Sequence, residues 1–161
     1  MIVRPAAQTD TGAIASLWHD GWRAGHLEHV PEELVALRTA ESFAERTATH
    51  LAAIRILSDD TGLIGFHLCK GDELNQFYLA ARARGSGAAE VLMRDAEATL
   101  RTHGHRLCWL ACAMGNVRAR RFYEKAGWRL ARTEAVALET LGDPYPLSVW
   151  RMEKDLVAGP T

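Results

Sequence analysis

Apolar residues recur at helical spacing near the start of the chain, at positions i, i+3, i+4, i+7 and i+8. These positions are Ile14, Leu17, Trp18, Gly21 and Trp22. The stripe predicts a helix with one face toward the core, capped at its N-terminus by Thr9 or Asp10. Pro31 is placed to begin a short second helix, and residues 40–51 predict a third helix with one apolar side.

Apolar and aromatic runs of strand length occupy much of the remaining chain. After a short strand at residues 2–4, residues 53–58 and 63–69 flank the turn Asp59-Asp60-Thr61-Gly62, and a second turn leads into residues 73–79. Three consecutive strands with tight turns predict an antiparallel meander. Residues 106–112 are apolar on both faces, which is typical of a central strand covered on both sides. Residues 129–139 and 145–154 predict a long terminal hairpin.

Small side chains crowd the turn between the strand at 73–79 and a helix that extends to about residue 103. The turn reads Gly85-Ser86-Gly87-Ala88-Ala89, with Arg84 before it. The first turn of a helix has unpaired N–H donors and a partial positive charge, so this turn is a ready phosphate site. It lacks the third glycine of a dinucleotide fingerprint and the Gly-Lys-Ser/Thr of a Walker loop. The strand, helix, strand order predicts a parallel pair with a crossover helix.

Two motifs together resemble one enzyme family. Arg84, Gly87 and Ala89 match the pattern Arg/Gln-x-x-Gly-x-Gly/Ala, which resembles the acetyl-CoA pyrophosphate loop of the GCN5-related N-acetyltransferases, the GNAT superfamily. The segment from Asn116 to Trp128 is similar to that family's second acyl-CoA motif, Asn-x-x-Ala-x-x-Phe-Tyr-x-x-x-Gly-Phe/Trp, and begins 27 residues after Ala89. Ala81 stands where the family often has proline, and Ala89 replaces its second glycine; neither departure changes the binding prediction.

We therefore expect a mixed α/β fold with a twisted, largely antiparallel sheet of six or seven strands, splayed beside the cofactor and flanked by about four helices. The resemblance implies that acetyl-CoA, as co-substrate and without a metal, acetylates a primary amine of a small molecule or peptide in a ternary complex. It also implies a set of cofactor-binding residues. These are Phe77, Leu79, Arg84, Gly85, Ser86, Gly87, Ala88, Ala89, Asn116 and Tyr123.

Acetyl transfer to an amine needs a base and an acid. An amine with a pKa near 10.4 must lose a proton before it attacks the thioester, and the departing CoA thiolate must gain one. Tyr123 resembles the family's general acid. Glu73 is our first candidate for the base, because it opens the strand that similar enzymes place beside the acetyl group. Asp72, His67, the His26–Glu28–His29 loop and a backbone carbonyl remain alternatives.

Residues that could contact the acceptor lie in the first third of the chain. Trp22, His26 and His29 are the candidates, although the stripe also fits Trp22 in the core and the two histidines in a solvated loop. An acidic pocket would favour a cationic amine, and a flat open groove would favour a peptide. The acidic residues considered for that pocket are Glu28, Glu32, Glu33 and Glu73. Two rival functions are acetylation of a protein N-terminus or lysine, and a non-catalytic acyl-CoA-binding module.

Composition narrows the class of protein further. The 161-residue chain is 48% hydrophobic with a net charge of −1, which predicts one domain over residues 1–156, a frayed tail at 157–161, and no nucleic-acid or membrane partner. No segment has the length of a membrane span, and the N-terminus does not resemble a signal peptide. Cys69, Cys108 and Cys112 fit buried free thiols in a cytoplasmic protein. Homodimerisation through the terminal strands is common in the family.

Overall fold

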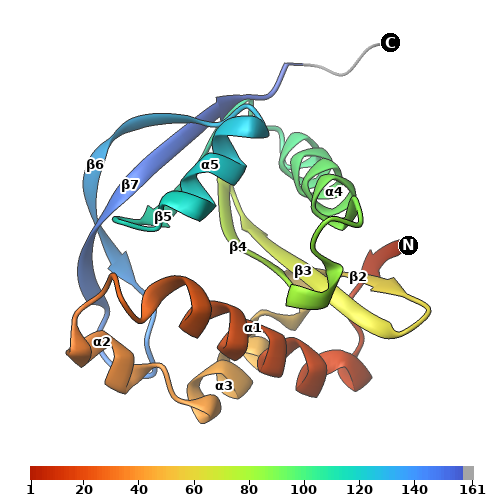
Figure 1. Ribbon diagram of the computed structural model, residues 1–161, viewed down its shortest axis with the longest axis horizontal. Coiled ribbons are helices and arrows are strands. Elements are labelled where there is room, and N and C mark those ends of the chain that lie inside the picture. The colour runs from red at the N-terminus through yellow and green to blue at the C-terminus, as the bar shows by residue number, and fades with distance from the viewer. Residues whose placement is uncertain (158–161) are drawn as a thin grey trace.

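The computed structural model describes residues 1–157, and its centre is a seven-stranded sheet (Figure 1). The strands are β1 (Ile2–Pro5), β2 (Ile54–Asp59), β3 (Gly62–Lys70), β4 (Glu73–Leu79), β5 (Leu107–Ala113), β6 (Arg129–Leu138) and β7 (Tyr145–Asp155). Within the described residues the α-helices are α1 (Thr11–His26), α2 (Glu32–Leu37), α3 (Ala40–His50), α4 (Ala88–Thr102) and α5 (Val117–Lys125). Short 3₁₀ turns occupy Gln8–Asp10, Leu51–Ala53 and Ala81–Ala83. The described residues thus contain five α-helices, against about four expected, and the predicted mixed α/β fold with a largely antiparallel sheet is confirmed.

The strands are arranged in the order β1-β2-β3-β4-β5-β7-β6. Every neighbouring pair is antiparallel except β4 and β5, which are parallel and are connected through α4. The predicted meander of β2, β3 and β4 is confirmed, as is the parallel pair with its crossover helix. The terminal hairpin of β6 and β7 is long and twisted (Figure 1).

The two parallel strands separate almost as soon as they meet. Glu73 and Trp109 are their one pair in register, supported by a 3.1 Å bond from the Trp109 N–H to the Asp72 carbonyl. Beyond this point β4 keeps its pairing with β3, and β5 keeps its pairing with β7. The splay implied by the family resemblance is therefore present, and it opens a gap in the middle of the sheet.

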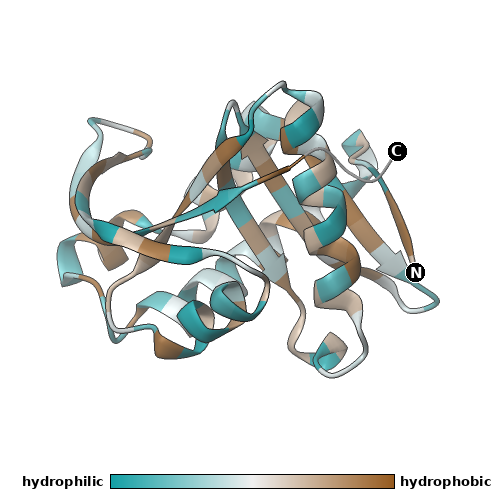
Figure 2. Ribbon diagram, turned by 90° about the horizontal axis from the view of Figure 1, so that it is seen from above, coloured by the Kyte–Doolittle hydropathy of each residue, from teal (hydrophilic) through white to brown (hydrophobic). Residues whose placement is uncertain are grey.

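Helices cover both faces of the central strand β3, which is buried from Ile64 to Cys69. Phe66 packs against Trp18 of α1, with ring centroids 5.5 Å apart, whereas Cys69 on the other face contacts the Ala96 carbonyl of α4. Hydrophobic residues accordingly concentrate along the central strands, and hydrophilic residues on the outer helix surfaces (Figure 2). The core therefore has two layers, one on each side of the sheet.

Strand β5 corrects one prediction. It is central in the sheet, but Leu107 and Ala111 on one face are exposed, so it is not covered on both sides. Its other face packs Cys108, Leu110 and Cys112 against the helical layer. No helix of residues 1–157 covers the first face, where the Arg151 guanidinium stacks 4.4 Å above the Trp109 ring instead.

Several further predictions can be checked directly. The three cysteines are buried and free, and burial raises the pKa of the Cys69 thiol to about 12. Pro31 lies immediately before α2 rather than inside it. In the part of the chain that the structure describes, no helix combines the length and the apolar character that crossing a membrane requires. Of the predicted tail, residues 158–161 lie outside the described residues.

Candidate active site

A cavity of about 500 Å³ lies where β4 and β5 separate. Its walls come from β4, the Gly-rich turn, the end of β5, one face of α5, the C-terminal half of α1, and the α2–α3 region with the terminal hairpin. The cavity therefore joins the two predicted acyl-CoA motifs to the segments in which we expected acceptor contacts. One continuous space could hold two substrates together.

The Gly-rich turn exposes backbone donors at one wall of the cavity. Gly85 and Gly87 have φ angles of +76° and +85°, which other residues rarely adopt, and a side chain at either position would meet no atom within 4 Å. Glycine is therefore required here by backbone conformation rather than by crowding. Within residues 1–157, the N–H groups of Gly85, Gly87 and Ala89 donate to no acceptor, and they precede or begin the 15-residue helix α4. This geometry suits a phosphate group.

Not every residue of the predicted loop faces the cavity. Arg84, Gly85, Gly87 and Ala89 line it. Ser86 instead braces the turn, because its hydroxyl donates to the Ala83 carbonyl and accepts from the Ala88 N–H at 3.3 Å. Ala88 is buried against the core. Ser86 and Ala88 thus shape the turn, while the other members of the loop are placed to contact a ligand.

Strand β4 supplies the floor of the gap. Phe77 and Leu79 line the cavity. The centroid of the Phe77 ring lies 5.5 Å from that of Phe122 and 6.5 Å from that of Tyr123, both on α5. The aromatic contacts hold α5 across the gap from β4. Since β4 has no strand partner on this side after Glu73, its backbone there is available to a bound molecule.

Asn116 links α5 to α1. Its side-chain oxygen accepts from the Ala119 N–H at 3.1 Å and caps α5, as the sequence predicted, and its nitrogen donates to the Gly25 carbonyl at 3.1 Å. Asn116 also lines the cavity. Its amide is largely committed to these two bonds, so its contact with the cofactor stays a prediction.

Tyr123 and Glu73 lie on walls of the same cavity. Burial raises the pKa of the Tyr123 phenol well above its usual value, which keeps the hydroxyl protonated at neutral pH. Burial likewise raises the pKa of the Glu73 carboxyl, against the hydrogen bond that Asn75 donates to it at 3.1 Å. A protonated phenol can donate a proton, and a carboxylate with a raised pKa is a stronger base.

The alternative bases occupy different surroundings. His67 is fully buried under α4, with Nε2 2.7 Å from Asp95, and does not line the cavity. Asp72 accepts from the Trp109 indole at 3.1 Å, outside the cavity lining. Among residues 1–157, Glu73 is the one carboxylate on the cavity wall.

Two of the three residues predicted to contact the acceptor line the cavity, and the third does not. Trp22 and His26 line the cavity with their rings stacked 4.8 Å apart, and His26 Nδ1 lies 2.8 Å from the Trp22 carbonyl. Burial lowers the pKa of His26 to about 4, so the ring is neutral at pH 7. His29 is exposed beside Gly115 and does not line the cavity.

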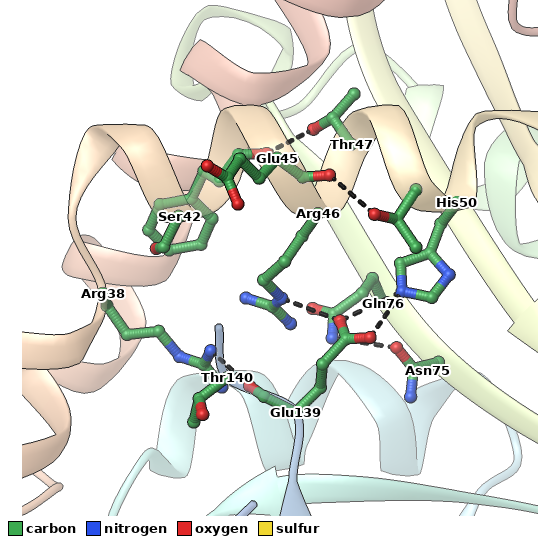
Figure 3. Close-up of polar contacts among 12 residues, drawn as sticks. Arg38, Ser42, Glu45, Arg46, Thr47, His50, Asn75, Gln76, Glu139 and Thr140 are labelled. Carbon is green, nitrogen blue, oxygen red and sulfur yellow. Dashed lines mark hydrogen bonds and ion pairs between the residues drawn. The ribbon is translucent and has the colours of Figure 1, made fainter. Parts of the chain in front are cut away.

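The acidic pocket considered from the sequence does not form. Glu28, Glu32 and Glu33 are exposed and lie outside the cavity lining. The cavity wall formed by α2 and α3 carries two arginines instead, Arg38 and Arg46, which were not among the residues predicted from the sequence (Figure 3).

One feature of the sequence could have indicated Arg46. It follows Phe43 by three positions, on the inward face of α3, where a charged residue is unusual. Tyr78 was missed as well; its ring packs directly over Gly21 and lines the cavity. The end of the cavity lined by α1, α2, α3 and the terminal hairpin, where we expect the acceptor and which we call the acceptor end, therefore carries cationic and aromatic side chains.

Comparisons with known proteins agree with this geometry. The profile of the family described as the acetyltransferase (GNAT) family matches residues 13–128. An uncharacterized N-acetyltransferase of Mycobacterium tuberculosis is 33% identical over 116 residues, which cover 69% of this chain and 74% of the relative.

Solved structures share the fold. A GCN5-related N-acetyltransferase from Rhodopseudomonas palustris superposes with a TM-score of 0.72 at 20% identity, over 96% of this chain and 94% of that one. PaiA N-acetyltransferase from Thermoplasma acidophilum, solved in complex with coenzyme A, gives a TM-score of 0.69 at 20% identity, over 96% and 98% of the two chains. With its profile match, its relative and its splayed sheet, the chain belongs to the acetyltransferase (GNAT) family of N-acetyltransferases.

Proposed function

We propose that this protein transfers the acetyl group of acetyl-CoA directly to a primary amine of a small molecule or peptide, with both substrates bound at once. The observation that carries the proposal is the single cavity that brings together the donor-rich Gly turn, Glu73 and Tyr123. The coenzyme A complex of the Thermoplasma acidophilum relative supports the choice of co-substrate.

Binding of the co-substrate falls to the two acyl-CoA motifs. The N–H groups of Gly85, Gly87 and Ala89 and the charge of Arg84 bind the pyrophosphate. Backbone groups of β4 between Phe77 and Leu79, unpaired on the side of the gap, bind the pantetheine arm and polarise the thioester carbonyl. The small side chains of the turn let the phosphates approach the backbone.

The chemical steps need two protons removed from the acceptor nitrogen, one before and one after its attack, and one proton supplied to the thiolate. Glu73 accepts a proton from the acceptor ammonium, directly or through a water, so that the neutral amine can attack the thioester carbon. A C–N bond then forms, the nitrogen releases its second proton to solvent, and the C–S bond breaks. Tyr123 donates a proton to the departing thiolate. Burial raises the pKa of the Glu73 carboxyl and so strengthens it as a base, while the Tyr123 phenol is protonated and lies on the wall of the same cavity.

The test is thiol release from acetyl-CoA by the purified protein with a panel of amines, amino acids and short peptides. We expect release above the hydrolysis blank, and a fall in kcat of about 10²–10⁴ in both Tyr123→Phe and Glu73→Gln. Tyr145→Phe, a half-buried tyrosine outside the cavity lining, is the matched control and should keep its activity.

Acetyl-CoA binding, measured by calorimetry, separates the possible outcomes. Unchanged binding in the two variants with lost turnover supports the assigned roles. Binding without release for any acceptor would instead identify a non-catalytic acyl-CoA-binding module. Full turnover in Tyr123→Phe would remove Tyr123 from the mechanism.

A further inference from the structure

Two buried arginines line the acceptor end of the cavity, where α2 and α3 meet the connection between β6 and β7 (Figure 3). Arg38 and Arg46 are each only 5% exposed. Burying a charged side chain is costly unless it is paired, so two guanidinium groups in one small region require an explanation.

Only one carboxylate in residues 1–157 is hydrogen-bonded to this pair. Arg38 Nη1 donates to the Glu139 backbone carbonyl at 2.6 Å, and Arg46 Nε donates to Glu139 Oε1 at 3.0 Å. His50 shares the same carboxylate, with Nε2 2.8 Å from Oε2 (Figure 3). One carboxylate against two guanidinium groups leaves an excess of one positive charge.

Several donors of the two guanidinium groups lack an acceptor. Arg38 Nε and Arg46 Nη1 are enclosed and have no hydrogen-bond partner within residues 1–157. The Nη2 atoms of both arginines also donate to no acceptor in this part of the chain, although both residues line the cavity. The Nη2 donors are not enclosed by protein, and together with the excess positive charge they favour a monoanion with planar oxygens, such as a carboxylate.

The arginines are held in position before any ligand arrives. The Arg46 guanidinium stacks 4.4 Å above the ring of Trp18, which is fully buried. Burial and the charge of Arg46 lower the pKa of Arg38 to about 10, an unfavourable environment that a second carboxylate would relieve. Such preorganisation reduces the cost of binding an anion.

The place of this pair identifies which substrate it meets. α2 and α3 lie beside the turn that connects β6 and β7, away from the start of α4, where the proposed phosphate-binding turn is located (Figure 1). The cavity wall around the arginines is apolar, with Leu34, Leu138 and Leu147. An anion bound here therefore belongs to the acceptor rather than to the phosphates of the co-substrate.

We propose that the acceptor is an amino acid-like molecule, a primary amine that also carries a carboxylate, and that Arg38 and Arg46 bind this carboxylate. The inference rests on the proposed acetyl transfer. It replaces the cationic amine favoured by an acidic pocket with an acceptor that has both charges, and the leucine wall favours one with an apolar side chain.

The test compares acceptors that differ only in the carboxylate. Thiol release is measured with apolar amino acids, with their amides, and with the corresponding aminophosphonic acids. We expect kcat/KM for an amino acid to exceed that for its amide by roughly 10- to 100-fold, the contribution of a charge-assisted hydrogen bond. Equal values would overturn the proposal, and a preference for the phosphonate would assign the site to phosphate instead.

Variants of the two arginines test whether the preference for the carboxylate depends on them. Arg46→Met and Arg38→Met should raise KM for the amino acid about tenfold or more without changing KM for acetyl-CoA or lowering the rate with the amide. Arg106→Met, an exposed arginine paired with Asp155, is the control and should change none of these. Glu139→Gln removes the competing carboxylate while keeping its shape, and should lower KM for the amino acid even if the arginine variants fold poorly.

Binding is measured as well as turnover, so that the two proposals fail separately. If no amine is acetylated although acetyl-CoA binds, the proposed function fails. Calorimetric titration of an amino acid and its amide into the CoA-loaded protein then decides the anion site. The anion site is supported if the amino acid binds, its amide does not, and the binding is lost in Arg46→Met. It is overturned if the amino acid does not bind or if the amide binds equally well.

Discussion

Gly21 provides a sharp test of how the acceptor end is packed. It lies within α1, where alanine is normally the better residue by about 1 kcal/mol. A β-carbon at this position, however, would lie 2.5 Å from Cδ1 of the Tyr78 ring, where about 3.5 Å is needed. The ring would have to move by about 1 Å, and Phe66 limits that movement, with ring centroids 5.8 Å away.

Two opposing contributions set the expected change in the free energy of unfolding of Gly21→Ala. Overpacking a filled site costs about 1–3 kcal/mol, and the helix preference offsets about 1 kcal/mol of this. Gly21→Ala should therefore lower the free energy of unfolding by about 0–2 kcal/mol. Gly12→Ala in the same helix, where a β-carbon would meet no atom within 4 Å, should raise it by up to about 1 kcal/mol.

Urea unfolding measures the stability of both variants, and an unchanged m-value shows that the difference in midpoint reflects stability. In a Tyr78→Ala background the clash is absent, so Gly21→Ala should become stabilising, as Gly12→Ala is. Because Tyr78 lines the cavity, Gly21→Ala should also raise KM for the acceptor more than KM for acetyl-CoA. A Gly21→Ala variant as stable as Gly12→Ala would refute the close contact between α1 and Tyr78.

Three further predictions address the turn, the cap and the pH dependence. Gly87→Ala should cost about 1–2 kcal/mol and weaken acetyl-CoA binding in calorimetry, because its φ is +85°, whereas Gly142→Ala, without a positive φ or a close neighbour, should be neutral. Asn116→Ala should lose about 0.5–2 kcal/mol in urea unfolding with its helix cap, while Asn116→Asp, which keeps an acceptor oxygen, should lose less. For His26 the folded pKa is about 4 against an ordinary 6.5, so the folded state binds fewer protons between these values and stability falls as pH drops from 6.5 to 4. The loss should total about 3 kcal/mol and be smaller in His26→Gln; an equal loss in both proteins would contradict the low pKa.

Features encoded in neighbouring residues could be predicted from the sequence. The stripe from Ile14 to Trp22 predicted α1, and Asn116 predicted the start of α5, because period and capping depend on a few adjacent positions. The Gly-rich turn was predictable for the same reason. Its two left-handed glycines and the helix that follows are all specified within a few residues.

Features that depend on contacts between distant segments could not be predicted in this way. Glu139 is 101 residues from Arg38 and 93 from Arg46 in sequence, and nothing local indicates that the three meet. The exposed face of β5 is a similar case. Its apolar residues have the composition of a covered strand, but coverage depends on which helices reach it, and an apolar run alone does not contain that information.

The splay between β4 and β5 connects the two kinds of feature. A parallel pair with one registered residue pair loses backbone hydrogen bonds that a closed sheet would make, and a buried polar backbone group without a partner is costly. The sequence places the compensation on either side of the gap, with Phe77 packed against Phe122 and Tyr123, and with Asn116 tying α5 to the Gly25 carbonyl of α1. These contacts link β4, α5 and α1 across the gap. The unpaired edge of β4 is the surface that we propose binds the pantetheine arm, and Tyr123, one of the residues packed across the opening, is our proposed general acid.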